Sequence, residues 1–543
     1  MKNIFKNYQK AFRKSIVPAL VLAMAFTSCE KNIDLQPYNQ VSETAAFQSP
    51  ALIALSVTGM YEAAQMGYYA NPVTSAPRGY PFGAAFVEQG DNRGEDVVNN
   101  ATFYQATYTA TYNASSTMNN VNYWKDSYRL LNRCNIIIDG VRTAATAKVI
   151  TDAQAAIYEG EARLLRAMTY HELLIHFARP FQDTPGATHM GVPYFESPFT
   201  TQAAIDAGMA TGRSTVAEVY AKIIADLDYA ETNLPLKAAM TGNSKITRAT
   251  KGAAVAEKTR IYLHMWNMDK VITEGTKFIS GSLAGTYALT ADPSGPFTSP
   301  YSNNESIFGM ENSATQNPGT NAALANMYAP TSAGGRGLVN ISPIIWRNPS
   351  WLTDDKRRTE GAMVTKVADA KNGGFAWYTN KYKDPVNKTD PSPMIRYAEV
   401  LLNMAEAYAR KGDVTNGLKF VNMVRDRALT TPATQSYTAA TFKDNVALVG
   451  AILDERRIEF LMEGRRWPDI HRLQKDALFP INGIPAKLAN AAVSGPLYTL
   501  GTPYPGPYGT PAIPYSDYRF LWPIPQDEIN SNPTLAAQQN PGW

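Results

Sequence analysis

The sequence predicts an all-α fold made of paired helices, with long irregular loops between the pairs. Apolar side chains recur three or four residues apart over several stretches, which is the period of one helix face. Between those stretches lie segments rich in Pro, Gly and Asn, and these carry many of the 30 Tyr, 20 Phe and 8 Trp residues. A stacked helical array can exceed the usual size of a single core, since each unit contacts only its neighbours.

The N-terminus has the order of a secretory signal that ends at a cysteine. Basic residues precede an apolar run at 16–26, and two small polar residues lead to Cys29. That run is too short for a membrane span, which needs roughly twenty residues, so we expect residues 1–28 to be removed. Cys29 would then carry acyl chains that anchor the protein, and residues 29–41 would form a tether. Phe26 departs from the usual pattern, in which bacterial lipoprotein signals carry Leu at this place.

Charge and cysteine content exclude several classes of protein. The formal net charge of +4 includes five basic residues of the signal, so the mature chain is close to neutral. This balance predicts neither a nucleic-acid-binding protein nor one that binds membranes through a basic patch. Cys134 is the one other cysteine, and an acylated Cys29 leaves it without a disulfide partner. Stability must therefore come from the core.

Helical periodicity recurs in six stretches, at 42–65, 123–141, 152–178, 215–233, 250–280 and 395–428. The first is expected to be capped by Ser42. Within the last, the turn 411–413 separates two helices with small residues along their contact, the layout of a degenerate tetratricopeptide repeat. Irregular segments occupy 67–112, 282–393 and 481–543, and they are the expected carriers of function.

Two motifs that suggest catalysis or metal binding have simpler interpretations. His171 and His176 resemble a zinc-protease helix motif, but they are five residues apart. Five residues leave the two rings about 140° apart around the helix axis, so they would not share a zinc ion. Glu455, Glu459 and Glu463 stand four apart among Arg456, Arg457, Arg465 and Arg466. Flanking arginines favour ionised carboxylates, so this helix predicts an ion-pair network and not a glycosidase acid. We expect no metal and no cofactor.

Six blocks in order resemble the signature blocks of the SusD/RagB family, and together they cover nearly the whole mature chain. They are YRLLNRCNIIIDGV (128–141), GEARLLRAMTYHELLIHFARP (160–180), AEVYAKIIADLDYAETNLP (217–235), IRYAEVLLNMAEAYAR (395–410), DERRIEFLMEGRRWPDIHRL (454–473) and LWPIPQDEINSNPTLAAQQNPGW (521–543). The resemblance implies a tetratricopeptide-like scaffold, with an N-terminal helical region at 42–235 and a C-terminal one at 236–543. Each region would carry ligand loops.

The resemblance also implies a function. A member of this family would be a lipoprotein of the outer membrane, facing outside, that binds a nutrient without cleaving it. It would act as the lid of a SusC-like TonB-dependent transporter, and its ligand would most often be an oligosaccharide. Two other readings stay open: a peptide-binding member of the family, and a surface hydrolase on the same scaffold, which only the carboxylate-rich helix suggests. A purely structural scaffold that holds other proteins is a weaker fourth reading.

Saccharide recognition needs flat aromatic rings for sugar faces, and amides, carboxylates or guanidiniums for hydroxyls. The first and second irregular segments supply both kinds of group. The predicted ligand-binding residues are Tyr68, Tyr69, Arg78, Tyr80, Phe82 and Asn92 in the first loop, and Tyr328 and Arg336 in the second. For any single ring among them, packing its loop onto the scaffold is the more common role, so we expect one or two true platforms in the set.

Overall fold

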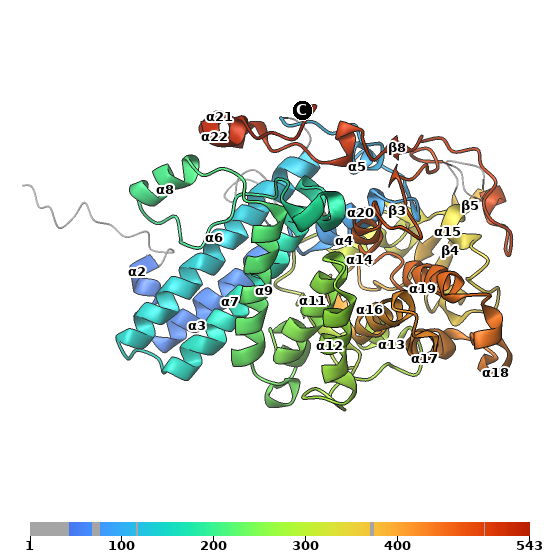
Figure 1. Ribbon diagram of the computed structural model, residues 1–543, viewed down its shortest axis with the longest axis horizontal. Coiled ribbons are helices and arrows are strands. Elements are labelled where there is room, and N and C mark those ends of the chain that lie inside the picture. Colours follow the sequence, from blue (N-terminus) through green and yellow to red (C-terminus); the bar gives the residue numbers. More distant parts are fainter. Residues whose placement is uncertain (1–42, 68–76, 116–117, 370–373, 493–494) are drawn as a thin grey trace, which may run out of the picture.

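The computed structural model describes residues 43–67, 77–115, 118–369, 374–492 and 495–543. Within these ranges the protein is mostly helical, as predicted, with four small sheets (Figure 1). The long helices are α3 (Pro50–Met66), α6 (Met118–Thr146), α7 (Asp152–Phe177), α9 (Val216–Asn233), α11 (Lys251–His264), α12 (Met268–Ile279), α16 (Tyr397–Arg410), α17 (Val414–Arg425) and α19 (Asn445–Glu459).

Shorter helices lie between and after these. They are α2 (Glu43–Ala46), α4 (Ala84–Asn92), α5 (Gln105–Tyr108), α8 (Gln202–Met209), α10 (Ser244–Thr247), α13 (Gly295–Thr298), α14 (Leu324–Tyr328), α15 (Pro343–Trp346), α18 (Pro432–Gln435), α20 (Arg466–Arg472), α21 (Gln526–Ser531) and α22 (Pro533–Ala536). The strands are β1 (Val97–Asn99), β2 (Ser306–Met310), β3 (Val339–Ile341), β4 (Val364–Asp369), β5 (Gly374–Thr379), β6 (Ser392–Arg396), β7 (Gly483–Ile484) and β8 (Ile513–Pro514).

The helices pack as hairpins laid side by side, as the periodicity predicts. α6 packs on α7 and α7 on α9, while α11 pairs with α12 and α16 with α17 (Figure 1). Side-chain caps define several starts: Thr215 and Glu218 form a reciprocal capping box at the start of α9. The turn between α16 and α17 places Gly412 at a φ of 85°, a conformation that glycine adopts without strain.

The predicted first helix is divided in two, because α2 spans Glu43–Ala46 and the long helix α3 begins only at Pro50. We predicted a helix at 42–65 capped by Ser42, but the long helix α3 is capped by Ser49, whose hydroxyl accepts from the Leu52 amide at 3.3 Å. Pro50 occupies the first helical position, where its missing N–H costs no hydrogen bond. Ser42 itself lies outside the described residues.

The strands form four antiparallel pairs, of which β1–β3 and β2–β6 connect segments that are distant in sequence, whereas β4–β5 is a hairpin. The pairs are β1 with β3, β2 with β6, β4 with β5 and β7 with β8. The β1–β3 ladder pairs Val97 with Ile341 and Asn99 with Val339, so it joins the first predicted loop region to the second. Each pair has only two short strands and is too small to be stable alone, so it depends on the structure around it.

A buried ion-pair network surrounds α19, as the sequence predicts, but with different partners. Glu455 contacts Arg357 at 2.6 Å and Arg425 at 3.1 Å, and Arg357 also contacts Glu459 at 3.1 Å. The expected partners lay in α19 and just after it, yet the arginines there turn to other acids. Arg457, for example, pairs with Glu95 and Asp96 of the first loop region. Each carboxylate is therefore paired across the tertiary structure and not along its own helix.

The two histidines of α7 enter different environments. The His171 ring lies 4.5 Å from the ring of His264, edge to face, whereas His176 stacks on Trp522 at 4.2 Å. Both are buried, and burial lowers the pKa of each well below its usual value. The described part of the chain contains no cluster of three or more residues able to hold a metal ion.

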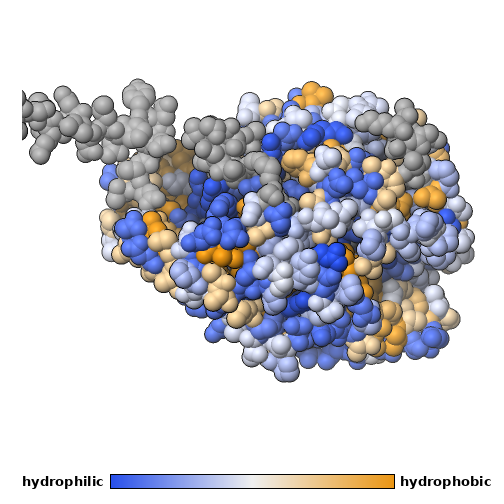
Figure 2. Space-filling view, turned by 90° about the horizontal axis from the view of Figure 1, so that it is seen from above, coloured by the Kyte–Doolittle hydropathy of each residue, from blue (hydrophilic) through white to orange (hydrophobic). Residues whose placement is uncertain are grey.

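No helix in the described ranges is long and apolar enough to cross a membrane. On the face shown in Figure 2, hydrophobic residues form small separate clusters among hydrophilic ones. One hydrophobic core runs from α3 to α22 and so crosses the division that we predicted at residues 235 and 236. That division, like the tether and signal before it, stays a prediction.

Removing one partner of a buried pair tests how far the network stabilises the fold. The carboxylate of Glu406 forms ion pairs with the guanidinium groups of Arg472 at 2.7 Å and Arg410 at 2.8 Å. Burial alone would raise its pKa, but the two guanidiniums lower it to about 2. We expect Glu406→Gln to reduce the free energy of unfolding by about 3–5 kcal/mol at pH 7, because it leaves buried arginines without their counter-charge.

The pH dependence has a defined sign. A folded pKa below the unfolded value means that this stabilisation is full above about pH 4.5 and is lost as pH falls toward 2. Urea unfolding at pH 7 and pH 3 should show the difference between variant and wild type shrinking at the lower pH. Glu196→Gln is the control, since Glu196 and Lys222 form an exposed pair and their loss should cost at most about 1 kcal/mol. Equal effects of the two variants would contradict the prediction.

Candidate functional site

The β1–β3 ladder brings the two predicted ligand loops to one place on the molecule. The ladder continues beyond β1, where the Asn100 amide donates to the Leu338 carbonyl at 2.7 Å. The Asn100 side chain also donates to the Gly337 carbonyl at 3.2 Å. The ladder thereby holds together two segments that are about 240 residues apart in sequence. It positions the side chains that follow β1 and those that precede β3.

Phe103 and two arginines form a group at this junction, which we call the Phe103 platform. The Phe103 ring is half-buried, and Tyr104 packs edge to face against it at 4.8 Å. The guanidinium carbon of Arg336 lies 5.6 Å from the ring centre and that of Arg78 lies 6.0 Å from it. Asn321 fixes Arg336 by accepting from Nη1 at 2.8 Å. Both residues are partly exposed, although Nε and Nη1 of Arg78 are buried, so the platform combines an aromatic face with one guanidinium on each side of the junction.

Buried polar groups lie beneath the platform. Burial raises the pKa of Glu88 well above its usual value, although Tyr104 and Arg336 act in the opposite direction. Tyr104 acts on Glu88 through a side-chain hydrogen bond, whereas neither side-chain polar atom of Asn92 has a hydrogen-bond partner within the described ranges. Burial therefore disfavours the ionised form of Glu88 beneath the two arginines.

Four of the predicted ligand residues are fully buried. Tyr80, Phe82, Asn92 and Tyr328 have no exposed surface. The Tyr80 hydroxyl donates to Asn119 Oδ1 at 3.1 Å, and the Tyr328 hydroxyl donates to Asp91 Oδ2 at 3.0 Å. In this conformation they pack α4 and α14 against the scaffold. Burial of a large aromatic ring removes a large apolar area from water and so stabilises this packing.

The remaining predicted residues divide in two. Arg78 and Arg336 are partly exposed residues that meet at Phe103, so the structure brings one residue of each predicted loop together. Tyr68 and Tyr69 lie outside the described residues. Sequence reasoning missed Phe103, although it stands beside Tyr104 in the same loop and the adjacent aromatic pair was a usable signal. Ligand contact by any of these residues stays a prediction.

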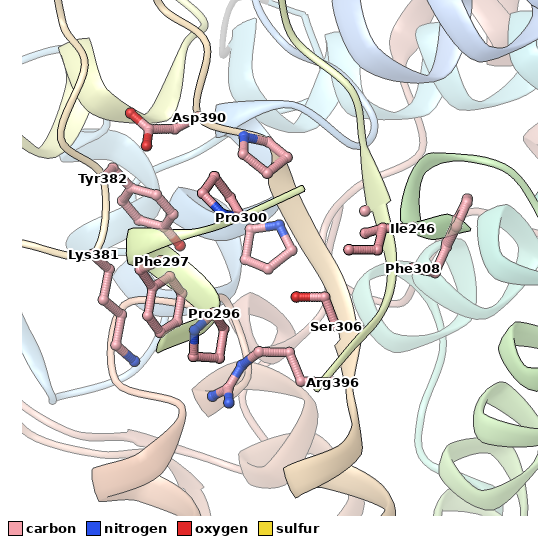
Figure 3. A pocket seen from close by; sticks show the side chains of 13 residues that line it. Ile246, Pro296, Phe297, Pro300, Ser306, Phe308, Lys381, Tyr382, Asp390 and Arg396 are labelled. Atoms are coloured by element: carbon pink, nitrogen blue, oxygen red, sulfur yellow. The ribbon is translucent and has the colours of Figure 1, made fainter. Parts of the chain in front are cut away.

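A pocket beneath β2 and β6 is too small for a saccharide. Figure 3 shows Phe297, Tyr382 and Arg396 among the side chains that line it. The cation of Arg396 lies 5.3 Å from the Phe297 ring centre, and Lys381 lies 5.0 Å from the same centre. Its volume of about 20 Å³ is near that of one water molecule, so the pocket belongs to the polar core.

Two family models match the chain, one in each half. The model described as "Starch-binding associating with outer membrane" matches residues 31–263, and the SusD family model matches residues 343–543. SusD-like protein P25 of Formosa agariphila is 22% identical, over 96% of this chain and 97% of that relative. SusD-like protein P38 of the same organism is 24% identical, over 88% of this chain and 95% of the relative.

Solved structures share the fold. A SusD superfamily protein from Bacteroides fragilis is 25% identical with a TM-score of 0.71, covering 90% of this chain and 99% of that one. Surface glycan-binding protein A from Bacteroides uniformis is 20% identical with a TM-score of 0.66, covering 91% of this chain and 99% of that one. The predicted all-α scaffold is thus confirmed.

The pH dependence of stability tests whether Asp91 is buried as the structure shows. Burial raises its pKa to about 8, although hydrogen bonds from Tyr328 and from the Gly464 amide favour the ionised form. A folded pKa above the unfolded value means that Asp91 lowers stability progressively as pH rises from about 4 to 8. Asp91→Asn removes this titration. We expect its stability relative to wild type to increase between pH 5 and pH 8 in urea unfolding, and parallel profiles would contradict this.

Proposed function

The chain belongs to the SusD/RagB family, and from this premise we propose that it is a cell-surface lipoprotein that captures an oligosaccharide and delivers it to a SusC-like TonB-dependent outer-membrane transporter. It would act as the lid of that transporter. The observation that carries the proposal is the match of both halves of the chain to family models, one of them described as starch-binding. A structural neighbour described as a glycan-binding protein supports the ligand class.

The Phe103 platform has the chemistry that a saccharide needs. A sugar ring presents C–H bonds on its faces and hydroxyls on its rim, so a phenyl ring can cover a face while guanidinium N–H groups donate to the hydroxyls. Arg78 and Arg336 lie on the two sides of the loop junction and would hold the ligand across it. We therefore place the binding site at Phe103, Arg78 and Arg336.

We propose binding without cleavage. A retaining or inverting glycosidase needs one ionised carboxylate and one protonated acid facing the same sugar bond. The carboxylates of α19, which the sequence offers as candidates for a glycosidase acid, are buried in ion pairs. Nearby guanidiniums hold the pKa of Glu459 far below its usual value despite burial. A screen of glycans and peptides for product formation separates this proposal from a surface hydrolase.

Phe103→Ala tests the platform. We expect the variant to bind oligosaccharides at least tenfold more weakly in calorimetric titration, because it loses the aromatic face while the scaffold is retained. Phe442→Ala is the matched control: Phe442 is also half-buried and packs edge to face on a tyrosine, Tyr437, at 5.1 Å. The panel should contain neutral saccharides, acidic saccharides and peptides. Binding of peptides alone would favour the peptide-binding alternative, and equal losses in both variants would move the site elsewhere.

Cys29→Ser tests the anchor and the transporter together. In cells of the native host we expect wild-type protein to incorporate labelled fatty acid and to co-purify with an outer-membrane barrel, whereas the variant should do neither. Cys134→Ser is the control, because Cys134 is buried and burial raises its thiol pKa to about 12, which makes it a poor acyl acceptor. Wild-type protein that carries the lipid but co-purifies with no barrel would overturn the lid proposal and leave the anchor.

A further inference from the structure

A groove of about 550 Å³ lies between α6, α8 and the C-terminal helices α21 and α22. Its volume is in the range of pockets that hold a drug-sized ligand or several side chains. Four aromatic residues line one wall in a chain of contacts: Trp124 meets Tyr128 at 4.7 Å, Tyr128 meets Phe195 at 5.9 Å, and Phe195 meets Phe199 at 4.9 Å. The groove includes no residue of the Phe103 platform.

The opposite wall is α8, a helix of eight residues with no buried side chain. Ile205 and Met209 stand four apart and therefore share a face, which lines the groove, yet they remain 40% and 39% exposed. Asn532 holds the chain just after the helix by donating to the Thr211 carbonyl at 2.7 Å. A helix this short is marginal in water without packing on one face. The Phe199 ring packs against Gly208 of α8, but the face that carries Ile205 and Met209 has room for a further apolar partner.

The described part of the chain begins next to α6. The Phe47 ring occupies the space where a Cβ on Gly140 of α6 would lie, 2.3 Å from that position. Asn132, a groove residue on the same helix, is eight residues from Gly140, or about 12 Å along the axis. Residues 29–42 can span roughly 45 Å when extended. The tether is thus long enough to reach the groove.

The tether also has a suitable sequence. Ile33 and Leu35 alternate, so both would face the same side of an extended segment. Lys31 precedes them, and the carboxylate of Glu528 at the edge of the groove forms no ion pair within the described ranges. A segment of the same chain is present at an effective concentration near millimolar, so it would occupy the groove ahead of a free ligand of similar affinity.

We propose that residues 31–38 of the tether bind in this groove, with Ile33 and Leu35 against the aromatic wall and the α8 face. The bound segment completes the packing of α8. It also shortens the free chain between Cys29 and the body to a few residues, so binding and release of the segment set how far the body can move from its anchor.

Disulfide trapping tests contact. In the mature chain with Cys29→Ser, we expect Leu35→Cys with Met209→Cys to form an intramolecular disulfide under mild oxidation, at least tenfold faster than Leu35→Cys with Leu55→Cys. Leu55 is the control, because it lies on nearby α3 and is 66% exposed but is not in the groove. Equal rates for the two pairs would overturn the proposal. Trapping only between two molecules would assign the groove to a second copy instead.

Hydrogen exchange tests the effect on α8. We expect Ile33→Ser with Leu35→Ser to speed exchange of the α8 amides at least tenfold, while the amides of α7 stay unchanged. Val386→Ser, at a position 75% exposed outside the groove, should leave α8 as in wild type. Unchanged exchange in α8 after the double substitution would show that the tether does not support this helix and would overturn the proposal.

Discussion

A charged side chain can leave water only where opposite charge and hydrogen bonds replace its hydration, and this constraint organises the C-terminal half of the fold. Arg396 ends β6 and contacts the carboxylates of Glu305, Glu459 and Glu463. Glu305 precedes β2 and Glu459 ends α19, so one guanidinium joins a strand pair to a helix that follows about 60 residues later. A shift of α19 by one turn would leave several charges unpaired at once.

The same network explains why the α19 acids are structural. Each carboxylate contacts guanidinium or ammonium groups from different elements. For Glu459 these cations hold the pKa far below its usual value despite burial, so this acid stays ionised near neutral pH. Replacing such a network by apolar residues need not destabilise a protein, but removing a single member does. The α19 acids therefore have a structural role in the buried network, and this role does not depend on which ligand the protein binds.

Local pattern predicted the helices well and the loops poorly. The period of apolar residues in α7 or α16 is a property of adjacent residues, so it can be read without knowing the rest of the chain. The burial of Tyr80 and Tyr328 depends on α4 and α14 packing on the scaffold, and the partners of Arg457 lie some 360 residues away. The β1–β3 ladder, which creates the Phe103 platform, is equally distant in sequence. Arg78 and Arg336 could be named from the sequence among eight candidates, but their meeting at Phe103 follows only from the tertiary structure. Ligand contact by these residues stays a prediction.

The β1–β3 ladder joins the two loops mainly through backbone hydrogen bonds, and backbone groups are the same whatever side chain each residue carries. The loops on either side can therefore accumulate substitutions while their relative placement is preserved. In such an arrangement the side chains that set specificity can change while the position of the two loops stays the same. A lineage with this ladder could change the molecules it recognises by exchanging a few rim residues, without having to evolve a new fold.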